Sequence, residues 1–433
     1  MKICLISEYF YPDNGGGTGT VLSNLARHLK DAYGDIEIDV ITSRHLYRGD
    51  GRRLERKESW DGIEIYRLDT PRPHASNIKK RLLANCRFSW AALRRLLRRG
   101  RYDLVLVSTA PPTVPLTARA FLGLTKTPYA YIVYDLFPDV AVALGVLDGA
   151  SRPAQMLYKA QNGWLHGAGK TIVLGRCMAA HLNQTYGLPR HKIEVIAVGA
   201  DAAQVVPMGR DTAFRCKNGL KDFVVLWAGN FGHHQNFDAI LDAALTLKNE
   251  GRAITFAFVG DGAKREHIAA RIAADKLDNV RMLPFVPASE FSDMLASADV
   301  SLVALEPGAE GLGVPSKFYN ILASGRPTVA LVALGSEVAH VLAENDCGVR
   351  LDQDGARLAQ VLAELEADPE RVREMGQNAR CALEAKYSMS QVARQFYAVL
   401  SEVAQTAPRT RATLKAARAR LEDEAALSME ACK

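Results

Sequence analysis

Lys317 is the residue whose type and position best suit it to bind a phosphate group. It stands in the first turn of a predicted helix, where unpaired backbone N–H groups already favour an anion. Pro315 suits the start of a helix, and the glycines at positions 308, 311 and 313 let the backbone approach a ligand closely. These residues predict a phosphate-binding loop. The alternative is a glycine turn beside a solvated surface lysine.

Two further glycine segments follow predicted strands. The run Phe223–Ala228 leads into one of them, and the run Ile3–Ser7 leads into the other. Each is followed by a helical pattern, so we expect backbone N–H groups there to face a ligand. The residues concerned are Gly229, Asn230 and Gly232 in the second half, and Gly15, Gly16 and Gly17 in the first. A bare glycine triplet is also typical of a flexible loop, and it is not a G-x-G-x-x-G fingerprint.

His234 and Phe285 are candidates for contacts with a nucleotide. His233 and His234 are adjacent, which is too close for a metal pair, and no carboxylate spacing completes a site. We interpret His234 as a hydrogen-bond donor near phosphate, with a surface position as the alternative. Phe285 follows the predicted strand Val280–Leu283, where its aromatic edge could contact a nucleobase.

Asp135 and Asp139 are the candidate catalytic carboxylates. Both come just after the predicted strand Tyr129–Val133, at the end where a parallel sheet binds ligands. A carboxylate in this position is able to accept a proton from an attacking hydroxyl or to orient a sugar. A helix N-cap at one of the two is the structural alternative.

Residues 72–101 form a basic amphipathic stretch without an acidic residue. Leucines, Phe88 and Trp90 are interleaved with ten basic side chains. These are Arg72, Lys79, Lys80, Arg81, Arg87, Arg94, Arg95, Arg98, Arg99 and Arg101. The pattern favours an anionic membrane surface or a lipid phosphate. A solvated helix face and nucleic acid are the alternatives, and nothing else in the chain supports nucleic acid.

Composition indicates a globular protein of more than one domain. The 433 residues are 48% hydrophobic and 24% charged, with a formal charge of +6. Seven scattered cysteines form no CxxC pair, so we expect neither a disulfide framework nor a zinc site, and we expect a cytoplasmic location. We expect no signal peptide, and no run reaches the roughly 18–20 apolar residues of a spanning helix.

Apolar strand-like runs alternate with amphipathic helical patterns almost throughout. This alternation predicts an α/β protein with two doubly wound parallel sheets. We expect residues 1–205 to form one Rossmann-like domain and residues 206–387 a second. Residues 388–405 then form a helix that packs back on the domains, and residues 406–433 form a charged tail.

Taken together, these motifs resemble the GT-B glycosyltransferases of family 4, in the branch of bacterial O-antigen and exopolysaccharide enzymes. The resemblance extends from Lys2 to about Val403. It rests on the order and spacing of six segments. They are the triplet Gly15–Gly17, DLFPD at 135–139, LGRCM at 174–178, AGNFG at 228–232, FVGDG at 258–262 and GVPSKFYNILASGRP at 313–327.

The resemblance implies transfer of a sugar from a nucleotide-sugar, with retention of configuration and without a metal cofactor. The donor, a UDP-sugar in preference to a GDP-sugar, would bind the C-terminal domain. Lys317 would pair with the diphosphate, while Glu310 or the backbone of Gly311 and Gly313 would hold the donor sugar. The acceptor would be lipid-linked or a polysaccharide, which implies a peripheral position at the inner face of the cell membrane.

The sequence departs from the family pattern at several donor-site positions. Leu312 and Asn320 replace the two acids of the usual Glu-x7-Glu pair, although Asn320 is still able to hydrogen-bond a ribose. Asn230 and Gln235 replace the usual Arg and Lys near the diphosphate, which gives Lys317 more of the charge. The preceding Ser316 completes the Pro-Ser-Lys motif of the branch. A sugar-nucleotide epimerase of the same fold and a catalytically silent nucleotide-binding relative are therefore the alternatives.

Overall fold

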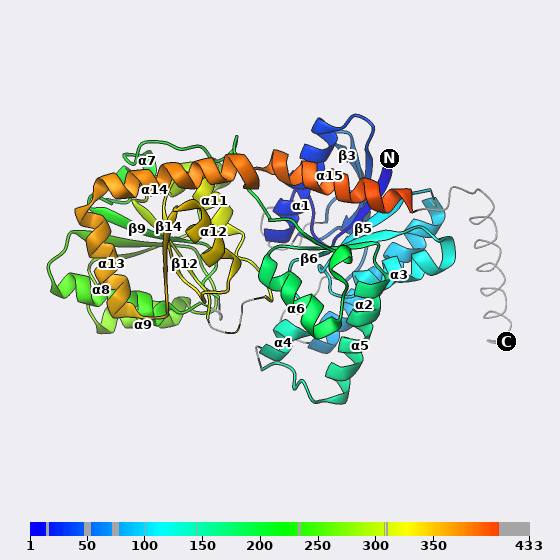
Figure 1. Ribbon diagram of the computed structural model, residues 1–433, viewed down its shortest axis with the longest axis horizontal. Coiled ribbons are helices and arrows are strands. Elements are labelled where there is room, and N and C mark those ends of the chain that lie inside the picture. The colour runs from blue at the N-terminus through cyan, green and yellow to red at the C-terminus, as the bar shows by residue number, and fades with distance from the viewer. Residues whose placement is uncertain are drawn as a thin grey trace. The chain divides into compact units, whose positions relative to one another are not determined.

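The computed structural model describes residues 1–13, 17–46, 53–71, 78–99, 101–143, 145–232, 235–306, 308 and 311–406 (Figure 1). They form two compact units. The first comprises Met1–Leu174, Ala179–Ile196 and the described chain from Ala393 onward, and the second comprises Gly175–Met178 and Ala197–Val392. The change from the first to the second unit thus comes at Ile196–Ala197, before residue 205.

The first unit is built on an eight-stranded sheet in the order β3-β4-β2-β1-β5-β6-β7-β8. All neighbours are parallel except β3 and β4. Its strands are β1 (Lys2–Ile6), β2 (Glu37–Ser43), β3 (Lys57–Trp60), β4 (Ile63–Leu68), β5 (Leu104–Ser108), β6 (Tyr129–Val133), β7 (Lys170–Val173) and β8 (Ile193–Val195). Its helices are α1 (Gly17–Ala32), α2 (Ile78–Arg99), α3 (Val114–Thr125), α4 (Asp139–Ala143), α5 (Arg152–Gly167) and α6 (Arg176–Tyr186), of which α6 begins in residues of the second unit.

Local sequence explains these elements. The central strands β5 and β6 are short apolar runs that are buried along their whole length, as expected when helices cover both faces of a parallel sheet. In α1, Leu22, Leu25, Ala26 and Leu29 recur at helical spacing and are all buried. Helix α15 (Met389–Gln405) continues from the second unit into the first. There the ring of Tyr397 stacks on Tyr33 with ring centroids 3.7 Å apart.

The second unit is built on a six-stranded parallel sheet in the order β11-β10-β9-β12-β13-β14. Its strands are β9 (Phe223–Ala228), β10 (Ile254–Val259), β11 (Val280–Leu283), β12 (Val300–Ala304), β13 (Thr328–Leu331) and β14 (Gly348–Leu351). Its helices are α7 (Ala213–Lys217), α8 (Phe237–Asn249), α9 (Arg265–Ala274), α10 (Phe291–Ala296), α11 (Lys317–Ala323), α12 (Glu337–Asn345), α13 (Gly355–Ala367) and α14 (Pro369–Ala382).

Helices cover both faces of the second sheet. In Figure 1, α8 and α13 lie on one side of the strands of this unit, and α11 and α12 lie on the other. The core on the first side joins strand residues such as Trp227 and Phe256 to Phe237 of α8 and Leu362 of α13, all fully buried. This arrangement confirms the predicted fold class, two doubly wound Rossmann-like domains.

The order of the second sheet determines where a ligand is expected. The chain runs outward from β9 through β10 to β11, then returns to place β12 on the other side of β9. This reversal is a topological switch point, and ligands of such sheets bind there, beyond the carboxyl ends of the strands. The loops after β9 and β12 therefore frame the expected site.

Two strands were not predicted from the sequence. Strand β3 has the sequence KESW, which is mostly polar, because it is an edge strand with exposed side chains. Strand β14 has the sequence GVRL, and it too lies at the edge of its sheet. Edge strands contribute few side chains to a core, so their sequences carry little apolar signal. No helix among the described residues is both long and apolar enough to span a membrane.

Candidate active site

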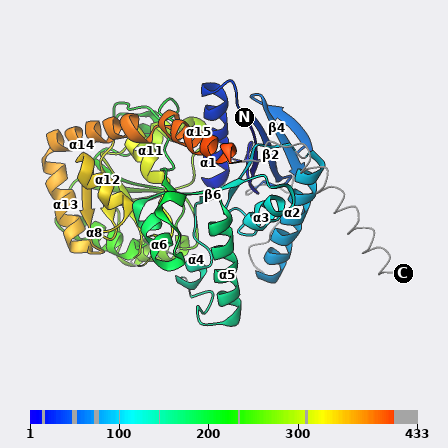
Figure 2. The same ribbon diagram turned by 45° about the vertical axis from the view of Figure 1, so that its right-hand side comes forward.

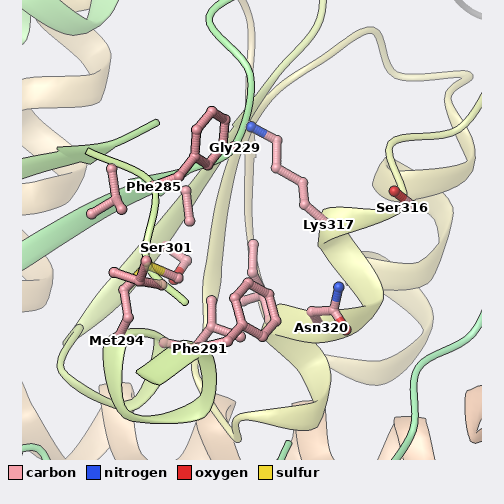
Figure 3. Close-up of a pocket in the computed structure, with 13 residues that line it drawn as sticks. Gly229, Phe285, Phe291, Met294, Ser301, Ser316, Lys317 and Asn320 are labelled. Carbon is pink, nitrogen blue, oxygen red and sulfur yellow. The ribbon is translucent and has the colours of Figure 1, made fainter. Parts of the chain in front are cut away.

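A pocket in the second unit lies at this switch point (Figure 3). Its walls come from the loops after β9, β10 and β11, from α10, from the start of α11 and from strand β12. It is lined by Ala228, Gly229, Val259, Phe285, Val286, Phe291, Met294, Leu295, Ser301, Ser316, Lys317, Asn320 and Ile321. Five of the predicted donor-site residues thus meet in one pocket: Gly229, Phe285, Ser316, Lys317 and Asn320.

Lys317 is the one basic side chain among the residues that line this pocket. It is the first residue of α11, as predicted, and its side chain extends from the helix towards Gly229 and Phe285 (Figure 3). Its ammonium nitrogen is buried and has no hydrogen-bond partner among the described residues. The nitrogen lies 3.1 Å from the centroid of the Trp227 ring. Burial lowers the pKa of Lys317 well below its ordinary value.

The rest of the pocket is mainly apolar with a few polar groups. Phe285 is 43% exposed, so its ring is open to a ligand. Phe291, Met294 and Ile321 add apolar surface to the lining. Asn320 lies one turn beyond Lys317 on α11. Such a pocket, apolar with a small number of fixed polar groups, is typical of a site for an organic ligand with a charged end.

Most backbone N–H groups of the AGNFG segment are already satisfied within the protein. Those of Gly229, Phe231 and Gly232 donate to the Val259 carbonyl at 2.9 Å, the Asp261 carbonyl at 2.8 Å and the Gln235 Oε1 atom at 2.7 Å. The expectation that Gly229 and Gly232 offer free N–H groups to a phosphate is therefore not met in this structure. The segment shapes the site instead of donating to an anion, and Lys317 is left as the main cation.

The glycines of the AGNFG and FVGDG motifs have a steric role. Gly260 has φ +155°, and a Cβ atom there would lie 1.9 Å from the Gly229 carbonyl oxygen. Gly229 itself has φ +132°. These two positions let the loops after β9 and β10 touch, which brings both to the mouth of the pocket.

The other predicted donor-site residues are not in the pocket wall or are not described. Asn230 is exposed and, like Gly232, Gly311 and Gly313, is not among the lining residues. Gly311 has φ +80°, which accounts for the glycine at that turn. Gly16, His234 and Glu310 lie outside the described residues, and Gly17 is the first residue of α1.

The two candidate carboxylates of the first unit have different environments. Asp135 is exposed, just beyond β6. Asp139 is buried at the start of α4 and accepts hydrogen bonds from the Tyr186 hydroxyl at 2.5 Å and from the His181 Nε2 atom at 2.9 Å. Burial and the bond to Asp139 raise the pKa of Tyr186. Because both Asp139 oxygens are engaged, Asp139 is suited to holding α4 against α6 rather than to accepting a proton. Figure 2 shows these helices side by side with α5.

A third carboxyl group in the first unit was not predicted. Glu8 lies just after β1 and is 8% exposed, and burial raises its pKa to about 7. The position of Glu8 directly after a predicted strand was available from the sequence. Its burial depends on packing, so no local pattern distinguished Glu8 from an ordinary surface acid.

Helix α2 confirms the predicted amphipathic pattern and shows which side is exposed. Ala84, Phe88, Ala92 and Leu96 are buried at four-residue spacing. On the other side, Leu83, Arg87, Trp90 and Arg94 follow one another at spacings of three and four, and all four are exposed. Leu83 is 53% exposed and Trp90 is 63% exposed. We call these four residues the α2 stripe. A second exposed leucine, Leu82, adjoins it.

Among the described residues, no three or more His, Cys, Asp or Glu side chains are grouped so as to hold a metal ion. In the described pocket, one basic side chain lies next to an apolar surface, a combination that suits an anion linked to a planar group.

Family models match both units. Residues 16–199 match the glycosyl transferase 4-like domain, and residues 211–381 match glycosyl transferases group 1. The "Probable glycosyltransferase WbjE" of Pseudomonas aeruginosa is 30% identical over 323 residues, which cover 73% of this chain and 79% of that protein.

Solved structures with this fold include Anabaena Alr3699/HepE and WaaG. Anabaena Alr3699/HepE in complex with UDP and glucose superposes with a TM-score of 0.68 at 15% identity, covering 93% of this chain and 99% of that one. WaaG, a glycosyltransferase involved in lipopolysaccharide biosynthesis, superposes with a TM-score of 0.65 at 17% identity, covering 90% and 97%. With both domain models and a relative of this similarity, the chain belongs to the GT-B glycosyltransferases of family 4.

Proposed function

We propose that this glycosyltransferase moves a sugar from a UDP-sugar to a lipid-linked or polysaccharide acceptor, with retention of configuration, in the assembly of a cell-surface polysaccharide. The observation that carries the proposal is the buried ammonium of Lys317, which has no hydrogen-bond partner among the described residues and belongs to a side chain in the wall of an apolar pocket at the switch point. An anion is the ligand that such a group needs, because a buried charge without a partner is strongly destabilising.

The donor side of the proposal assigns each part of the pocket to a part of a nucleotide-sugar. Phe285 and the apolar wall contact the nucleobase, Asn320 hydrogen-bonds the ribose, and Lys317 binds the diphosphate. As the bond between sugar and phosphate breaks, negative charge grows on the leaving diphosphate, and Lys317 stabilises that charge. Lys317, rather than a metal ion, is then the main cation on the diphosphate. HepE in complex with UDP and glucose, a protein of the same fold, supports UDP as the nucleotide.

The acceptor side of the proposal involves the first unit and a membrane surface. The α2 stripe combines exposed Leu83 and Trp90 with Arg87 and Arg94, a combination that suits the headgroup region of an anionic membrane. A lipid-linked acceptor would lie at such a surface, with the protein peripheral to its cytoplasmic side. WaaG, which has the same fold and is involved in lipopolysaccharide biosynthesis, supports this pathway class. Asp135 is our candidate for orienting the acceptor hydroxyl.

The test is release of the nucleoside diphosphate from a panel of UDP-, GDP- and ADP-sugars, measured with and without a bacterial lipid extract as the source of acceptor. We expect one donor class to react and Lys317→Ala to lower turnover by roughly 100-fold or more, as expected on losing a charge-stabilising group. Arg373→Ala is the matched control, because Arg373 is exposed and lies outside the donor pocket.

The two alternatives give different outcomes in the same assay. A silent relative would bind a nucleotide but release no diphosphate from any activated sugar. An epimerase would convert the nucleotide-sugar into an isomer without needing the lipid extract. Equal turnover in the wild type and in Lys317→Ala would contradict the assignment of Lys317 to the diphosphate.

A further inference from the structure

Trp227 is a core residue with an unusual neighbour. It lies in β9, is fully buried and packs in a cluster of aromatic rings, with the Phe237 ring 4.7 Å away. One face of the indole is occupied by the Lys317 ammonium, 3.1 Å from the ring centroid. The Trp227 Nε1 atom is also buried and has no hydrogen-bond partner among the described residues. Among the described residues, the ring face is thus the one partner recorded for the Lys317 ammonium, while the Trp227 N–H keeps no acceptor.

The ring face substitutes for the hydrogen-bond acceptors that the ammonium lacks. The Lys317 nitrogen is buried without an acceptor in the described part of the chain. A cation over an aromatic face is attracted by the ring quadrupole, the attraction is strongest for Trp, and it is greater when the pair is removed from water. An aliphatic residue at position 227 would fill space but give the ammonium nothing to bind.

The side chain that carries this ammonium is part of the wall of the donor pocket. The Lys317 side chain lines the pocket, and its Cδ atom lies 3.8 Å from where a Cβ atom of residue 229 would be. Figure 3 shows the side chain extended along the pocket towards Gly229, rather than folded out to solvent. The Trp227 contact thus keeps a long and otherwise mobile side chain at the place where an anion is expected, which lowers the entropy lost on binding.

We propose that Trp227 is a positioning residue for Lys317: its ring face holds the ammonium beside the donor pocket, ready for the diphosphate. This inference rests on the proposed function, because it assumes that the anion at Lys317 is the diphosphate of the donor. It adds a role for a buried residue that touches neither the nucleotide nor the sugar.

Calorimetric titration with UDP and with uridine tests the proposal. Trp227→Leu removes the ring face and is expected to weaken UDP binding roughly tenfold, which is about 1.4 kcal/mol. Uridine binding should not change, since uridine has no phosphate for Lys317. Trp227→Phe, which keeps an aromatic core if the leucine variant fails to fold, should lie between the wild type and Trp227→Leu.

Two controls separate positioning from packing. Phe237→Leu removes a ring from the same buried cluster without touching Lys317, so it should leave UDP affinity near that of the wild type. In a Lys317→Met background, the Trp227 substitutions should have no further effect on UDP affinity, because the residue through which they act is gone.

The outcomes distinguish failure of the inference from failure of the proposed function. If UDP does not bind the wild type, the proposed function fails and the inference falls with it. If Lys317→Met weakens UDP binding but Trp227→Leu and Trp227→Phe do not, the inference alone is wrong. Trp227→Leu could weaken the binding of UDP and of uridine equally, or it could change UDP affinity as much as Phe237→Leu does. Either result would mean that Trp227 only shapes the core.

Discussion

At the scale of single residues, Lys317 illustrates a group that costs the fold stability in return for a binding site. Its ammonium is buried beside an aromatic ring and lacks a hydrogen-bond acceptor among the described residues. Buried cations without partners are rare, because removing a charge from water is unfavourable. Functional sites are where such groups are tolerated.

This burial predicts a pH-dependent difference in stability between the wild type and Lys317→Met. Burial lowers the pKa of Lys317 in the folded state below the unfolded value of 10.5. Between these two pKa values the unfolded chain binds the proton more readily, so the wild type loses stability as the pH falls through that window. Methionine does not titrate, so Lys317→Met should have the higher free energy of unfolding. The difference in the free energy of unfolding between the two proteins should grow by up to about 1.4 kcal/mol per pH unit as the pH falls.

Urea unfolding of both variants at a series of pH values from 6 to 10 measures this margin. Other titrating groups act equally on the two proteins and cancel in the difference. A margin that stays constant with pH would mean that Lys317 is solvated and has an ordinary pKa in the folded protein.

The sequence predicted Lys317 and four other residues of the pocket, but not the contact of Lys317 with Trp227. Lys317 and Asn320 could be found because they lie on a short helix after a glycine-rich loop, a local pattern. The contact with Trp227 depends on packing α11 against β9, and these elements are far apart in the chain. Asp139 was a candidate for catalysis because it follows β6 in the sequence. The structure shows that it accepts hydrogen bonds from His181 and Tyr186, and these contacts could not be predicted from the local sequence.

At the scale of elements, helix α2 has a buried side that packs on the first unit and an exposed side that mixes basic and apolar residues. Its buried side carries small and apolar residues at four-residue spacing, and its exposed side carries the α2 stripe. Trp90 is 63% exposed between two arginines, which leaves its ring open to a partner outside the chain. The amphipathic pattern was predictable because it repeats along one helix. The edge strands β3 and β14 were not, because few of their side chains enter a core.

We predict that the protein co-sediments with vesicles containing phosphatidylglycerol and that salt weakens the binding, because exposed charges are screened at high ionic strength. The variant Arg87→Glu/Arg94→Glu should lose most of the binding, and Trp90→Ser should lose part of it at every salt concentration. Lys221→Glu/Arg373→Glu changes the net charge equally on exposed residues of the second unit, so it is the matched control.

Equal loss of vesicle binding in the α2 variant and in the control would point to net charge rather than to the α2 stripe. Binding that is absent in the wild type, or unaffected by salt, would leave α2 as an ordinary solvated helix and remove the membrane surface from the proposal.

At the scale of the whole molecule, two Rossmann-like units divide the work that the proposal requires. The second unit has the pocket with Lys317, and the first unit has the exposed Asp135 and the α2 stripe. Both sheets were predictable because their strands are apolar runs that alternate with helices at regular intervals. The change between units at Ile196–Ala197 was harder to place, because the chain there leaves one sheet without a marked change in composition.

The most direct test of the account is a thermal-shift screen of the whole protein with UDP, GDP, ADP, CDP and dTDP, repeated with Lys317→Ala. The account predicts that UDP raises the melting temperature of the wild type more than the others do, by mass action on the folded state. In Lys317→Ala the shift should largely disappear. Equal shifts in the two proteins, or no shift with any of the five nucleotides, would contradict the claim that Lys317 binds the diphosphate of the donor.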